Sequence, residues 1–101
     1  MSVSAETSND GKSITIAISG QFDFNVVQEF RNTYMNIDAE QSDVVLDMRE
    51  AVYMDSSALG MLLNMKKHLG VTDRSIRIVN CCPQVKKILD ISRFDKKFQI
   101  G

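Results

Sequence analysis

A short apolar run in the middle of the chain constrains the fold more than any other feature. Residues 43–48 read Asp-Val-Val-Leu-Asp-Met and are nearly continuous in apolar side chains at their centre. This composition is typical of a strand buried on both faces, as in the centre of a parallel sheet. Because a parallel neighbour is reached only through a crossover, the segment around 43–79 is expected to form a right-handed strand–helix–strand unit.

The residues ahead of this run predict a hairpin. We expect a short strand over 3–8 and a turn at 9–12, because Asp-Gly tolerates the left-handed backbone of a tight turn. Residues 13–19 then alternate strictly, as a half-buried strand does. One face of this strand carries Ile14, Ile16 and Ile18, and we expect Gly20 to end it.

A helix is predicted next, from the spacing of apolar residues. Asn25 and Gln28 have the form of a capping box, so we expect the helix to start at Asn25. Asp23 is then left in the preceding loop, where it is not needed as the cap. The residues at helical spacing are Val26, Val27, Phe30, Tyr34 and Ile37.

The second half continues the alternation of strands and helices. A polar-rich run leads from the central strand to a helix from about Ser57 to Leu69, ended by Gly70. A strand over 75–79, a helix opened by Pro83 and a last short strand over 97–100 follow. The expected core positions of the two helices are Leu59, Leu62, Leu63 and Leu69, and Val85, Ile88 and Leu89.

The predicted order is therefore β-β-α-β-α-β-α-β, an α/β fold with a mixed sheet of four to five strands. The 101 residues fit one domain, over 1–101. The formal net charge of -1 argues against nucleic acid as a direct partner. No segment predicts a signal peptide or a membrane span, and two adjacent cysteines without a third predict a reducing, cytoplasmic setting.

The residues offer little for catalysis, so we expect no enzyme and no cofactor. His68 is the only histidine and lies late in a helix, beside lysines, where it is expected to be solvated. Cys81 and Cys82 are expected to be small packing residues between a strand and a helix rather than a redox pair. One histidine and two adjacent cysteines do not supply a zinc site, and no metal is expected.

Met61 and Met65 lie four residues apart on the second helix, and two interpretations of them remain open. They fill gaps in the core, or they form a soft apolar patch for a protein partner, because methionine adapts to uneven surfaces.

The run Asp55-Ser56-Ser57 indicates the start of a helix from its chemistry alone, since Asp and Ser accept hydrogen bonds from unpaired amides. Its surroundings add more. Residues 52–60, Val-Tyr-Met-Asp-Ser-Ser-Ala-Leu-Gly, resemble the signature of STAS domains, specifically the bacterial anti-sigma-factor antagonists. The similarity extends over nearly the whole chain: residues 18–23 resemble the family's Gly-x-x-Asp stretch, 44–47 its central strand and 82–85 its entry to the third helix.

The resemblance implies a switch. In the family, a partner that is both an anti-sigma factor and a serine kinase, of the histidine-kinase-like ATPase type, phosphorylates the first serine after the aspartate. The matching residue is Ser56, with Ser57 as the weaker alternative. The unphosphorylated antagonist captures the anti-sigma factor and releases its target, phosphorylation ends this binding, and a PP2C-type phosphatase resets the cycle. The expected partner-binding residues are Asp23, Asp55, Ser57, Met61 and Met65.

Two departures from the family pattern and one alternative accompany this expectation. Ala58 stands where glycine is frequent, and the chain ends where many members continue, so we expect the final family helix to be missing. Asp23 has a second interpretation as a simple loop cap. The alternative function is a non-switching STAS module, such as a stressosome scaffold part or a lipid-transport complex subunit, in which Ser56 only caps a helix.

Overall fold

The computed structural model of the chain describes residues 3–35, 43–69 and 76–100. The expectations for Ile37, Gly70 and Ser75 lie outside these residues. The described elements, in chain order, are β1 (Val3–Thr7), β2 (Ser13–Phe22), the 3-10 helix η1 (Phe24–Val26), α1 (Val27–Tyr34), β3 (Asp43–Met54), α2 (Ser56–Leu69), β4 (Ile76–Val79), α3 (Pro83–Ile91), the 3-10 helix η3 (Phe94–Lys96) and β5 (Gln99–Ile100).

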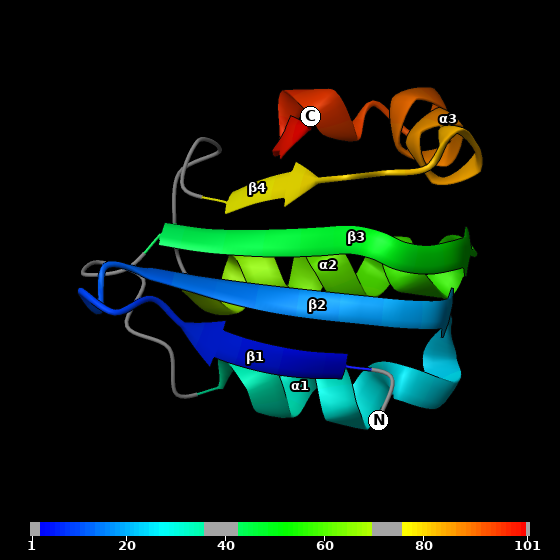
Figure 1. The fold of residues 1–101 in the computed structure, drawn as a ribbon. Coiled ribbons are helices and arrows are strands. Elements are labelled where there is room, and N and C mark those ends of the chain that lie inside the picture. The colour runs from blue at the N-terminus through cyan, green and yellow to red at the C-terminus, as the bar shows by residue number, and fades with distance from the viewer. Residues whose placement is uncertain (1–2, 36–42, 70–75, 101) are drawn as a thin grey trace.

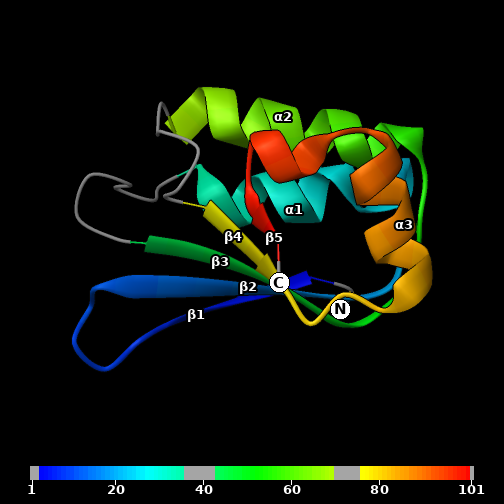
Figure 2. The ribbon, with the colours of Figure 1, turned by 90° about the horizontal axis from the view of Figure 1, so that it is seen from above.

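The five strands form one mixed sheet in the order β1-β2-β3-β4-β5 (Figure 1). β1 runs antiparallel to β2, and every later pair is parallel. Figure 2 shows α1 and α2 on the same side of the sheet, with no described helix on the other face of β1–β3. The predicted α/β class and order of elements are therefore confirmed.

The core lies between the sheet and its helices. Its strand residues alternate as predicted in β2, where Ile16 and Ile18 are fully covered, and β3 contributes Val44, Leu46 and Met48. Phe22 and Phe30 contact each other with ring centroids 5.2 Å apart, which ties the end of β2 to α1. Among the described residues, no polar or charged side chain is buried.

β3 is longer than predicted because two register irregularities interrupt its apolar pattern without ending the strand. Ser13 pairs with Asp43 and Phe22 with Met54, so 12 residues of β3 run beside 10 of β2. The register shifts once between Ala17 and Ser19 and again between Gly20 and Gln21. Such β-bulges place two consecutive residues on the outside of a strand. The predicted polar connection after residue 48 is thus part of the strand.

Gly20 was expected to end β2, and this was wrong. Its backbone is left-handed, with φ of +76°, and it lies at the second register shift while the strand continues to Phe22. Glycine adopts this conformation without the steric cost that a side chain would add. The glycine predicted in the first turn, Gly11, also has a left-handed backbone, with φ of +72°, as the hairpin requires.

The start of the first helix also differs from the prediction. The Asp23 carboxylate, rather than Asn25, caps η1, and α1 begins only at Val27. The capping box does not form because the Asn25 N–H, which Gln28 would accept in such a box, donates to Asp23 Oδ1 at 3.0 Å. The Gln28 amide donates to Asn32 Oδ1 at 3.2 Å. Val27, expected in the core, is 44% exposed, whereas Val26, Phe30 and Tyr34 are buried.

Ile76 and Ile78 of β4 are buried, and Pro83 opens α3, as predicted. Val85 and Leu89 of α3 are fully covered, with Ile88 packed against the core. The last strand, β5, pairs with β4 over only two residues.

Candidate functional site

The sheet register brings two aspartates to the same edge. Phe22 pairs with Met54, so Asp23 and Asp55 each follow the last residue of neighbouring parallel strands. Such strands lie about 4.8 Å apart, and their carboxyl ends meet at one edge of the sheet. The beginnings of η1 and α2 are therefore neighbours, each with an aspartate in front.

Asp55 caps α2 with its side chain. Its Oδ1 atom accepts hydrogen bonds from the N–H of Ser57 at 3.0 Å and of Ala58 at 3.2 Å, and also from the Ser57 hydroxyl. The hydrogen bond from the Ser57 hydroxyl is the largest influence on the pKa of Asp55 and lowers it. Burial opposes this, but the backbone amide hydrogen bonds add to the lowering, so the pKa lies below its usual value. Asp55 thus holds a negative charge at the helix start, where the helix dipole favours it.

The two serines that follow Asp55 differ in their surroundings. Ser57 is half-buried and its hydroxyl is bonded to Asp55. Ser56, the first residue of α2, is exposed, and the structure gives its hydroxyl no hydrogen-bond partner among the described residues. An enzyme that modifies a hydroxyl therefore meets Ser56 first, and it reaches Ser57 only after the bond to Asp55 is broken.

Asp23 has the geometry of a loop cap as well. Its Oδ1 accepts a hydrogen bond from the N–H of Asn25 at 3.0 Å, and its carbonyl accepts one from Val26 at 3.1 Å. The expectation that Asp23 is not needed as a cap was wrong. The residue that follows it, Phe24, is 66% exposed, and sequence reasoning missed it because it lies outside the helical period.

Of the two interpretations left open for Met61 and Met65, the structure supports the core one. Met65 is fully buried and Met61 is 6% exposed, so both fill the core between α2 and the sheet. Leu63, expected in the core, is 39% exposed instead. Met65 therefore offers a partner no surface, and Met61 offers only its small exposed part.

Removing the α2 cap gives a direct test of this geometry. We expect Asp55→Ala to lower the free energy of unfolding by about 1 kcal/mol, as loss of an N-cap commonly does. Because the folded pKa of Asp55 is lowered, its charge stabilises the fold above the unfolded pKa, and this contribution disappears as the pH falls through the folded value. Urea unfolding at pH 7 and at pH 3 measures the size of the loss and its dependence on pH. Asp90→Ala, at an exposed position of α3, is the control. An equal loss at both pH values would contradict the role of the Asp55 charge as a cap.

The other reactive groups lie elsewhere. Burial, and next the neighbouring Cys82, raise the pKa of Cys81 to about 11, which leaves little thiolate at neutral pH. The Cys82 thiol lies 3.7 Å from the carbonyl of Ala51. The His68 ring packs on Tyr34 with centroids 5.4 Å apart, and its Nε2 is 3.4 Å from the carbonyl of Met35.

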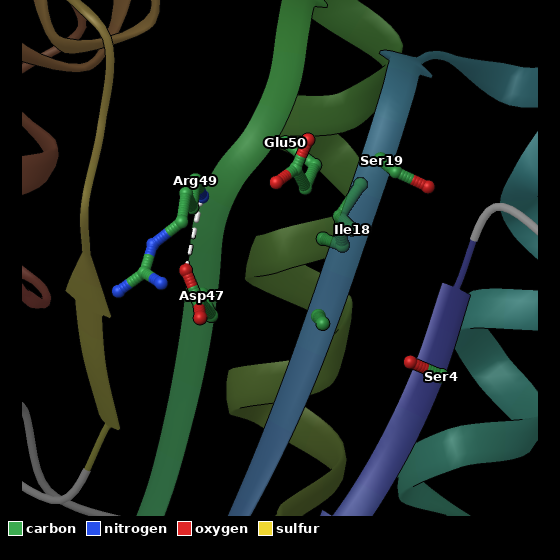
Figure 3. Close-up of a pocket in the computed structure, with 7 residues that line it drawn as sticks. Ser4, Ile18, Ser19, Asp47, Arg49 and Glu50 are labelled. Carbon is green, nitrogen blue, oxygen red and sulfur yellow. Dashed lines mark hydrogen bonds between the residues drawn. The ribbon is translucent and has the colours of Figure 1, made fainter.

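A hollow of about 310 Å³ lies on the open face of the sheet, where the first bulge of β3 exposes Arg49 and Glu50 (Figure 3). Asp47 borders it; burial disfavours its charge, but hydrogen bonds from the Arg49 N–H at 3.0 Å and the Asn80 amide at 3.1 Å outweigh this and lower its pKa. Figure 3 shows the strands between this hollow and α2, so it is separate from the serine site.

Fold and site together define the class of this protein: a small α/β domain whose exposed polar residues gather where two helices begin beside each other. The chain belongs to the STAS domain family, whose model matches residues 3–101. The resemblance that the Asp-Ser-Ser run indicated is thereby confirmed. No helix within the described ranges has the length and apolar character to cross a membrane.

Relatives support the same assignment. A STAS-domain containing protein of Pseudomonas aeruginosa is 45% identical over 101 residues and covers 100% of both chains. The anti-sigma-B factor antagonist of Staphylococcus aureus is 24% identical, over 91% of this chain and 86% of its own length. The structure of the anti-sigma factor antagonist SpoIIAA in its unphosphorylated form aligns with a TM-score of 0.77 at 20% identity, over 98% of this chain and 87% of that one, and shows the shared fold.

Proposed function

We propose that this chain is an anti-sigma-factor antagonist whose partner binding ends when Ser56 is phosphorylated. The observation that carries the proposal is the contrast between the two serines: Ser56 has an exposed, unbonded hydroxyl, and Ser57 is tied to Asp55. Membership of the STAS family and similarity to an anti-sigma-B factor antagonist support the class of partner.

Phosphorylation at this position fits the fold. A phosphate adds about -1.5 to -2 charges near neutral pH. At the first residue of α2 it meets the positive end of the helix dipole, so the helix tolerates it. Asp55 and Asp23 lie nearby, so the new charge makes this edge strongly negative. The effect of the phosphate therefore falls on the partner rather than on the stability of the domain.

The partner in this proposal is an anti-sigma factor with serine kinase activity, of the histidine-kinase-like ATPase type, and a PP2C-type phosphatase removes the phosphate. The partner contacts the residues around Ser56, which are Asp23, Asp55 and Ser57. The two aspartates also cap η1 and α2. The chain acts by binding, without catalysis of its own, in the cytoplasm, and it contacts neither nucleic acid nor membrane.

Phosphate incorporation tests the site. We expect the purified kinase of this type from the same genome to label wild type and Ser57→Ala, and to leave Ser56→Ala unlabelled. Ser57→Ala is a matched control because it removes a hydroxyl one residue away and leaves Ser56 exposed. Phosphopeptide mass spectrometry assigns the position. Persistent labelling of Ser56→Ala together with loss in Ser57→Ala would move the site to Ser57.

The absence of labelling by any such kinase would favour the alternative, a non-switching STAS module in which Ser56 only begins a helix. That module class includes scaffold and transport-complex subunits. In that case, Ser56→Asp would also leave binding to the module's own partners unchanged.

A further inference from the structure

The groove between α1 and α2 is a second feature of the face that carries Ser56. It has a volume of about 260 Å³, with Phe30, Tyr34 and Met61 in its floor. We infer that it receives an amphipathic helix of the partner, one with an apolar stripe and carboxylates at one end. This inference rests on the proposed function and extends it from a single serine to a docking surface.

The groove runs between α1 and the second half of α2. Both helices leave the same edge of the sheet, after the parallel strands β2 and β3, and they lie side by side in Figure 2. Val27, Arg31 and Met35 are four residues apart along one rim, and Asn64 and His68 along the other. Residues four apart share one helix face. The same spacing of four, continued along α2 from Asn64, passes through Gly60 and Ser56, so the serine lies beyond one end of the groove on the same helix face.

Apolar side chains line the α1 side of this surface and remain exposed. Val27 is 44% exposed and Met35 41%, both on the groove rim. Phe24, in η1 just ahead of α1, is 66% exposed. Grouped exposure of large apolar side chains marks interaction surfaces, whereas single ones are ordinary. A helix that lies in a groove presents apolar residues every three to four positions, which matches this spacing.

Gly60 supplies an independent observation on the α2 side. It lies one turn after Ser56, in the interior of α2, and is exposed. A Cβ atom added there would meet nothing within 4 Å, so the packing of the chain itself does not require a glycine. Glycine in a helix interior costs roughly 1 kcal/mol relative to alanine. Close approach of another backbone is the use that glycine serves at such a position.

The charges around the groove indicate which kind of partner helix fits it. α2 contains no acidic residue, and its last turn carries Lys67 beside the groove residue His68. The third basic residue of that turn, Lys66, lies over the Phe98 ring at 5.9 Å and is not part of the groove. Arg31 lies in the last turn of α1, on the facing rim. The far end of the groove is therefore basic, whereas the serine end carries Asp23 and Asp55. A helix with carboxylates toward the basic end complements this pattern, and a phosphate on Ser56 would change the charge at the other end.

The test uses the purified kinase that labels Ser56 and its affinity for the intact chain, measured by isothermal titration calorimetry. We expect Gly60→Ala to weaken binding about tenfold while the melting temperature stays equal or rises, because alanine favours helix. We also expect the Arg31→Glu/Lys67→Glu double variant to weaken binding at least about tenfold. The matched control Lys87→Glu, on the exposed face of α3, should stay within about twofold of wild type.

The outcomes separate this inference from the function it rests on. Wild-type affinity in both groove variants, combined with loss of binding in Ser56→Asp, would overturn the groove and leave the switch intact. If no kinase of this type binds wild type, the proposed function fails and the groove assignment fails with it. Loss of binding in Lys87→Glu equal to that of the double variant would reduce the effect to total charge and would also overturn the groove.

Discussion

Truncation of Met65 to alanine is expected to lower the free energy of unfolding by about 2–5 kcal/mol, the usual range for buried methionine. Met65 is fully covered on the inner face of α2. Its removal takes apolar surface out of the core and leaves a cavity that close-packed neighbours fill only in part. For a domain of this size the loss corresponds to a fall in melting temperature of about 10–30 °C.

Leu63 on the same helix is the matched control. It is 39% exposed, so Leu63→Ala should cost at most about 1 kcal/mol. Urea unfolding followed by circular dichroism measures both variants. The sequence predicted Leu63 in the core and left Met65 open between core and surface. A larger loss for Leu63→Ala than for Met65→Ala would therefore contradict the structure.

The core-facing residues of α2 follow a helical period that the sequence contains, but the prediction chose core residues by type instead. The buried residues Ala58, Met61, Leu62 and Met65 follow the spacing of one helix face. The prediction instead gave leucines to the core: Leu62 is fully buried, Leu59 and Leu69 pack against the core in part, and Leu63 is exposed. The period was the better guide, because a small residue and two flexible ones fill a close helix–sheet contact well.

The fold class was predictable because strands and helices differ in period, and the order β-β-α-β-α-β-α-β followed from that difference alone. The lengths of β2 and β3 could not be predicted from the sequence. A bulge adds a residue to one strand without changing its neighbour, so Gly20 and the residues after 48 read locally as breaks. The pairing of the two strands through Phe22 and Met54 shows that they continue.

The candidate site was predictable in its parts but not in its arrangement. The Asp-Ser-Ser run marked the start of α2 within one residue. Its proximity to Asp23 depends on strand register, which no local pattern gives. The distinction between Ser56 and Ser57 depends on which hydroxyl the Asp55 carboxylate binds, and only the folded geometry shows this.

The second large effect concerns the switch. A phosphate on Ser56 is expected to weaken kinase binding about a hundredfold, because binding must then remove a group of about -1.5 to -2 charges from water beside Asp55. Ser56→Asp carries one charge and should give a smaller loss, about tenfold. Ser56→Ala is the neutral control and should bind as wild type, because the cap of α2 comes from Asp55 rather than from Ser56.

The most direct test is the affinity of the kinase for the chain phosphorylated stoichiometrically at Ser56, compared with the unphosphorylated chain, together with both melting temperatures. We expect the kinase to bind the phosphorylated chain about a hundredfold more weakly. The free energy of unfolding should change by less than about 1 kcal/mol, because the phosphate lies at a helix N-terminus. Equal affinity of the two forms would contradict the switch. A weaker affinity that is accompanied by a large fall in melting temperature would show that phosphate acts by unfolding the domain instead.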